Sequence, residues 1–70
     1  MTEVAQLVEA AESTDVRVGL RAAVALRRLA ERLEALQVER ARHEGWSWQQ
    51  IADALQVTRQ AVHKKYARRA

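Results

Sequence analysis

The residues best suited to chemistry in this chain of 70 residues are cations gathered at its C-terminal end. From Arg59 onward the sequence holds five lysine and arginine side chains and no carboxylate. Residues 1–39 carry a net charge of −2 and residues 40–70 a net charge of +5, so the overall charge of +3 is strongly polarised. Cations clustered along one helix are the electrostatic footprint expected of a phosphate-binding surface. The C-terminal part is therefore predicted to bind an anionic partner.

Residues for catalysis or metal binding are sparse. The chain has no Cys, and His43 and His63 do not stand at a ligand spacing, so we expect neither a metal nor a cofactor. The sequence offers no nucleophile with a neighbouring base, no acid pair and no phosphate-binding loop. It predicts a protein that is not an enzyme and has no small-molecule substrate.

The composition indicates an all-α fold. Proline is absent, Gly occurs twice, and Ala, Leu, Glu, Arg and Gln dominate, all of which favour helices. No apolar run approaches the roughly 20 residues that span a bilayer, and Glu3 near the start does not fit a secretion signal. We therefore expect no membrane partner and a cytoplasmic location, on the nucleoid.

Two helices are predicted before residue 45. Thr2 can cap a helix over residues 3–12, and the run of polar residues at 13–15 offers three N-caps that end it and begin the next. No further break occurs before Gly45, so the second helix runs from Val16 for about 29 residues, or roughly 43 Å.

Two apolar stripes run along this long helix. Val16, Leu20 and Val24 are predicted to pack on the first helix. A later stripe has the 3-4-3 spacing of a short coiled coil; we call it the leucine seam, and its members are Leu26, Leu29, Leu33 and Leu36. Because a chain this short buries only about 60% of its unfolded surface, the seam is predicted to pair two copies as a homodimer. With only two heptads, the alternative is that these leucines face an intramolecular core.

Local signals define the C-terminal unit. Gly45 suits a left-handed helix end, Ser47 and Gln50 form a capping box, and Trp46 and Ile51 stand at hydrophobic-staple positions, which predicts a helix over residues 48–55. After a tight turn containing Val57, Thr58 caps the last helix, in which Ala61 and Val62 are predicted to face inward. Trp46 and Trp48 are interpreted as core and staple residues in preference to base-stacking platforms.

The pattern Gly-x-Ser-x-x-Gln-Ile-Ala-x-x-Leu-x-Val-Thr-x-x-x-Val, residues 45–62, resembles the DNA-reading helix-turn-helix of bacterial sigma factors and phage-type repressors. Ala52 matches the small residue where the two helices cross, and Leu55, Val57 and Val62 match core positions. Gln56 stands where the family usually has Gly, which predicts a left-handed, slightly strained residue. Residues 1–44 are then a helical dimerisation scaffold and residues 45–70 the DNA-binding unit of one compact domain. Because the helix before Gly45 is more polar than its sigma-factor counterpart, polymerase binding is not transferred.

The resemblance implies that the last helix enters the major groove of double-stranded DNA. Arg59 can donate two hydrogen bonds to guanine and Gln60 can pair with adenine, which makes them the predicted specificity residues of a transcriptional regulator. The predicted DNA-contacting set is Ser47, Gln49, Thr58, Arg59, Gln60, His63, Lys64, Lys65 and Arg68.

Two other interpretations stay open. The leucine seam could bind a different protein, which would make the chain an interaction module or adaptor without specific DNA readout. The basic end could also be a solvated helix terminus, since cations there complement the helix dipole. That explanation covers Arg68 and Arg69 but not Arg59 and Gln60.

Overall fold

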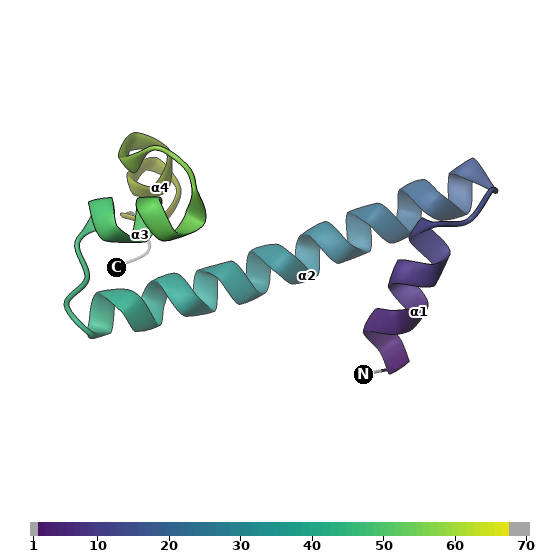
Figure 1. The fold of residues 1–70 in the computed structure, drawn as a ribbon, viewed down its shortest axis with the longest axis horizontal. Coiled ribbons are helices and arrows are strands. Elements are labelled where there is room, and N and C mark those ends of the chain that lie inside the picture. The colour runs from purple at the N-terminus through teal and green to yellow at the C-terminus, as the bar shows by residue number, and fades with distance from the viewer. Residues whose placement is uncertain (1, 68–70) are drawn as a thin grey trace. The chain divides into compact units, whose positions relative to one another are not determined.

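The computed structural model describes residues 2–67, which form four helices (Figure 1). They are α1 (Thr2–Ala11), α2 (Val16–His43), α3 (Trp48–Leu55) and α4 (Arg59–Tyr66). Residues 2–67 contain no strand, so the predicted all-α class is confirmed, and the helix predicted over 48–55 agrees to the residue. The predicted cap at Thr2 depends on a side chain outside this description, and so do the predicted roles of Arg68 and Arg69. Within the described range no helix combines the length and apolarity needed to cross a membrane.

The chain divides into two compact units, one up to Leu33 and one from Glu34 onward, and α2 contributes to both. In the first unit, Asp15 is the residue that begins α2. Its Oδ1 accepts hydrogen bonds from the backbone amides of Arg17 at 3.0 Å and Val18 at 3.3 Å. Ser13 Oγ in turn accepts from the Asp15 amide at 3.0 Å. Of the three caps that the sequence offered, the structure therefore uses Asp15 for α2 and Ser13 to hold the turn before it.

Helix α1 approaches α2 at small residues. A Cβ built on Gly19 would lie 3.5 Å from the carbonyl oxygen of Ala11, and Ala22, one turn further along α2, is buried. The prediction that Val16 and Leu20 pack on the first helix is wrong, because Val16 is 71% exposed and Leu20 64% exposed, whereas Val24, the third residue of that stripe, is partly buried. A backbone can come this close only where side chains are small, so the Gly19 side of α2 is favoured over the bulkier valine and leucine stripe.

The core of the second unit joins the end of α2 to α3 and α4. It consists of Val38, Ile51, Ala52, Val62 and Tyr66, with Ala35, Ala41, Trp48 and Leu55 packed against it. Ala52 has no exposed surface, which fits a position where the two short helices cross. The predicted core roles of Ala52, Leu55 and Val62 are therefore confirmed.

Two residues predicted to face inward do not: Val57 is 47% exposed, and Ala61 is exposed. Trp46 is 40% exposed, so it is only partly covered. Val62 and Tyr66 lie four residues apart on the inner side of α4, which leaves the neighbouring position 61 on its outer side. Val57 follows a left-handed residue, and the turn is held by backbone hydrogen bonds, so its side chain is not needed in the core.

Candidate nucleic-acid interface

The start of α3 is fixed by the predicted capping box. Ser47 Oγ accepts a hydrogen bond from the Gln50 amide at 3.1 Å, and Gln50 Oε1 accepts one from the Ser47 amide at 2.8 Å. Gly45 has φ +88°, as a left-handed helix end requires, and the guanidinium of Arg42 donates to the Trp46 carbonyl at 2.8 Å. The connection from α2 to α3 is therefore held by these bonds, and the Ser47 hydroxyl oxygen is engaged in capping α3.

The turn between α3 and α4 has the geometry that the sequence predicted. Gln56 is left-handed, with φ 60° and ψ 39°, and the Val57 amide donates to the Ala52 carbonyl at 3.0 Å. Thr58 then begins α4, because its Oγ1 accepts from the Ala61 amide at 3.1 Å. Thr58 was predicted as a DNA contact, and its hydroxyl oxygen is already engaged in capping.

Helix α4 presents Arg59, Gln60, His63 and Lys64 to solvent. Within residues 2–67, Arg59, Gln60 and Lys64 make no side-chain hydrogen bond or ion pair. They are therefore free to bind another molecule.

His63 and Gln49 differ from these three because both have intramolecular partners. The imidazole of His63 meets the Trp48 ring edge-on, with 5.6 Å between centroids, while the guanidinium of Arg42 lies 4.4 Å from the same Trp48 ring. Trp48 is thus held between α2 and α4 and packs against the core, which agrees with its interpretation as a core residue. Gln49 Nε2 donates to Asp53 Oδ1 at 2.9 Å, one turn along α3.

Lys65 is an anchor within the second unit. Its ammonium lies 3.2 Å from Glu34 Oε2 on α2, and the hydroxyl of Tyr66 donates to the same oxygen. The hydrogen bond from Tyr66, followed by Lys65, lowers the pKa of Glu34, and the bond to Glu34 raises the pKa of Lys65. Burial is the main cause that raises the pKa of Tyr66. No local pattern in the sequence indicates this contact, since its partners stand more than 30 positions apart.

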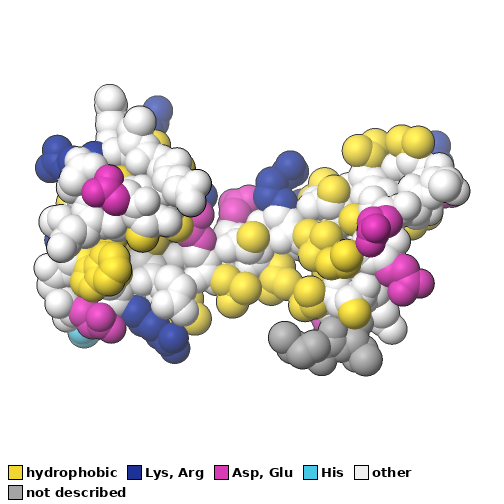
Figure 2. Space-filling view, in the orientation of Figure 1, with side chains coloured by type: hydrophobic (Ala, Val, Ile, Leu, Met, Phe, Trp, Pro, Cys, Tyr) yellow, Lys and Arg dark blue, Asp and Glu magenta, His cyan; other side chains and the backbone are white. Residues whose placement is uncertain are grey.

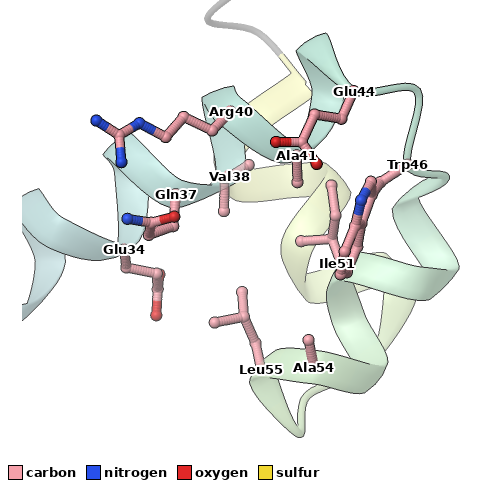
Figure 3. A pocket seen from close by; sticks show the side chains of 10 residues that line it. All are labelled: Glu34, Gln37, Val38, Arg40, Ala41, Glu44, Trp46, Ile51, Ala54 and Leu55. Atoms are coloured by element: carbon pink, nitrogen blue, oxygen red, sulfur yellow. The ribbon is translucent and has the colours of Figure 1, made fainter.

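A hollow of about 330 Å³ opens between the end of α2 and α3 (Figure 3). Trp46 lies beside Ile51 there, and the rest of the apolar lining is Val38, Ala41, Ala54 and Leu55. Trp46 therefore covers the start of α3 as a staple would, while one side of its ring stays in solvent. The described residues include no group of three or more His, Asp or Glu side chains that could hold a metal ion.

No protein-family model, curated protein or solved structure matches this chain. The resemblance of residues 45–62 to sigma factors and repressors therefore stays a prediction, and the function has to be argued from the residues themselves.

Proposed function

We propose that this protein is a sequence-specific DNA-binding transcriptional regulator that inserts α4 into the major groove. In this proposal it acts as a homodimer paired through the leucine seam, in the cytoplasm and on the nucleoid. It is not an enzyme and uses no cofactor.

The observation that supports the proposal best is the state of Arg59. It is the first residue of α4, it is exposed, and no described side chain pairs with it. The N-terminus of a helix carries partial positive charge, so a cation there costs about 0.3–1 kcal/mol, and α4 has no acid in its first turn to offset it. A residue that destabilises its own helix and has no internal partner is expected where a ligand supplies the missing partner.

The neighbours of Arg59 suit a DNA duplex. Arginine donates two hydrogen bonds to guanine O6 and N7, and glutamine pairs with adenine N6 and N7, so Arg59 and Gln60 offer direct base readout. Lys64 lies just over one turn further on and can neutralise a phosphate. Lys65 and Arg42 already bind groups within the second unit, so we assign them the role of holding that unit together. The proposed DNA contacts are then made by the three side chains without a partner among residues 2–67, those of Arg59, Gln60 and Lys64.

Helix α4 is attached to the rest of the second unit along its buried side and at both ends. Val62 and Tyr66 are buried in the core, Thr58 caps the helix at one end, and the contact of Glu34 with Tyr66 and Lys65 ties the other end to α2. A base contact discriminates only when the side chain that makes it starts from a fixed backbone.

The proposal is tested by selecting binding sites from random duplexes with the wild type, Arg59→Ala and Gln60→Ala. Each substitution should relax the preference at one base position by about 1–3 kcal/mol, that is, by about 5- to 150-fold. Arg28→Ala and Gln6→Ala are matched controls, because these exposed residues have no side-chain hydrogen bond or ion pair among residues 2–67 and lie outside the second unit. Unchanged base preference in both α4 variants would remove α4 as the reading helix.

Stability provides a second readout of the same variants. Arg59→Ala should leave the thermal midpoint unchanged or slightly higher, because it removes the cation that opposes the helix dipole. A loss of DNA binding that tracks a loss of folding would instead mean that Arg59 is structural.

The second candidate is an interaction module that binds another protein through the leucine seam. It is favoured by the exposure of Leu33, 53%, and Leu36, 43%. Salt separates the two functions: DNA binding should weaken steeply as salt rises, whereas pairing through an apolar seam should not.

A further inference from the structure

The leucine seam is least covered at its C-terminal end. Leu26 and Leu29 are partly buried, whereas Leu33 and Leu36 are exposed, and Figure 2 shows hydrophobic side chains at the surface along the middle of α2. The midpoint of this exposed part lies between Leu33 and Leu36. A partner helix centred there would cover both of the exposed leucines.

One flank of the seam carries opposite charges one heptad apart. Arg32 stands directly before Leu33 and Glu39 stands three residues after Leu36, so both occupy the position next to the seam on the same side of α2. Both are exposed, and neither has a side-chain partner among residues 2–67. The opposite flank is neutral at Ala30 and Gln37. Charges at these flanking positions set the orientation of paired helices.

We propose that a second copy of this chain packs antiparallel on the leucine seam, with the two-fold axis between Leu33 and Leu36. Leu33 then faces the partner's Leu36, and Arg32 lies beside the partner's Glu39. By symmetry each of these contacts occurs twice. This inference rests on the homodimer in the proposed function and adds its orientation and register.

Charge complementarity selects this arrangement over the others. Parallel helices would place Arg32 beside the partner's Gln37, which is neutral. They would also place Glu39 beside the partner's Glu44, so that two negative charges face each other. An antiparallel pairing shifted by one heptad would bring either Arg32 against the partner's Arg32 or Glu39 against the partner's Glu39. Only the register centred between Leu33 and Leu36 forms two pairs of opposite charge.

The ends of α2 accommodate the same register. Helix α1 approaches α2 at Gly19 and Ala22 is buried, so a partner helix finds open seam only from Leu26 onward. In the proposed register Leu26 faces the partner's His43, the last residue of α2, and Leu29 faces the partner's Arg40. The aliphatic stem of an arginine can cover a leucine while its charge stays in water. The stretch over which the two copies of α2 pair therefore ends at Leu26 of one copy, which is where the partner's α2 ends.

The first test is a charge exchange followed by sedimentation over a range of protein concentrations, without DNA. Arg32→Glu and Glu39→Arg should each raise the dimer dissociation constant by roughly tenfold, because each turns two attractive pairs into two repulsive ones. The double variant should return it to the wild-type value. Arg27→Glu, on the opposite side of α2, is the matched control and should change nothing. Stronger pairing by Glu39→Arg would overturn the proposal, because that is the result expected of parallel helices.

Disulfide trapping is the second test, and it is direct because the chain has no cysteine of its own. In the proposed register residue 26 of one copy lies opposite residue 43 of the other. The two copies of residue 26 are therefore separated by 17 positions along the helix, roughly 25 Å. Leu26→Cys alone should therefore form no cross-link, while a mixture of Leu26→Cys and His43→Cys should form a mixed dimer. Cross-linking of Leu26→Cys alone would overturn the orientation.

These results are independent of DNA binding, so the two proposals fail separately. A wild-type protein that is monomeric at every concentration would overturn the antiparallel dimer and leave the seam to a different protein, while the reading of DNA by α4 would stay open to its own test. A cross-linked antiparallel dimer that binds no duplex would overturn only the DNA-reading function.

Discussion

Gln56→Gly is expected to stabilise the protein. Gln56 has φ 60° and is exposed, and its side chain makes no hydrogen bond within the described part of the chain, so its left-handed backbone is a cost that its side chain does not offset. A left-handed conformation costs a residue with a Cβ about 1–2 kcal/mol. Glycine avoids that cost but gives up about 0.5–1 kcal/mol of unfolded-state entropy, so the net gain lies between about 0 and about 1.5 kcal/mol, with a midpoint of about 0.75 kcal/mol. At that midpoint the melting temperature of a domain of this size should rise by roughly 3–6 °C.

Thermal unfolding followed by circular dichroism measures the effect. Gln56→Asn should fall between wild type and Gln56→Gly, because asparagine tolerates left-handed geometry better than glutamine. Gln37→Gly is the matched control, since Gln37 is an exposed residue inside α2 and glycine there should cost about 1 kcal/mol. If Gln56→Gly destabilises the protein as Gln37→Gly does, the explanation of the turn is refuted.

Glu34→Gln and Tyr66→Phe should each cost about 1 kcal/mol, and the double variant little more than either alone, because the two groups share one hydrogen bond. Since the pKa of Glu34 is lowered in the folded state, the wild-type advantage over Glu34→Gln should be present at pH 7 and should shrink as the pH falls from the ordinary value of 4.5 through the lower folded-state pKa; an advantage that does not shrink as the pH falls would contradict this. Leu33→Asp should give a monomer by sedimentation and weaken binding to a selected duplex, because it places two carboxylates in the proposed dimer interface. A Leu33→Asp dimer as tight as the wild type would place the interface elsewhere.

The C-terminal helices were predictable because their ends are specified by neighbouring residues. Ser47 and Gln50 satisfy each other's amides, Gly45 accepts a left-handed conformation, and Thr58 caps the next helix. Each signal acts within three residues, so it does not depend on how the rest of the chain folds. The bounds of α3 followed directly from these signals, whereas the left-handed Gln56 was predicted from the resemblance to the helix-turn-helix family.

Side-chain burial was less predictable, because it depends on which face another element covers. The sequence offers α1 two faces of α2, and hydrophobicity favours Val16 and Leu20, but the close approach occurs at Gly19. The contact from Glu34 to Tyr66 joins residues 32 positions apart and has no local pattern. Lys65 is the residue of the candidate site most affected, since it was predicted as a phosphate contact and is also an internal anchor.

The cations of α4 differ in whether the fold explains them, and this difference is the strongest argument for a ligand at α4. Lys65 forms an ion pair with Glu34, and Lys64 lies in the last turn of α4, where a cation complements the helix dipole. Arg59 has neither explanation: it lies at the end of the helix where its charge is unfavourable, and no acid is near it in the first turn. A phosphate or an electron-rich base edge at that position would turn the same charge from a cost into a contact. Replacing Arg59 with Ala should therefore leave the DNA-free protein as stable as the wild type or slightly more so, and should weaken its recognition of DNA.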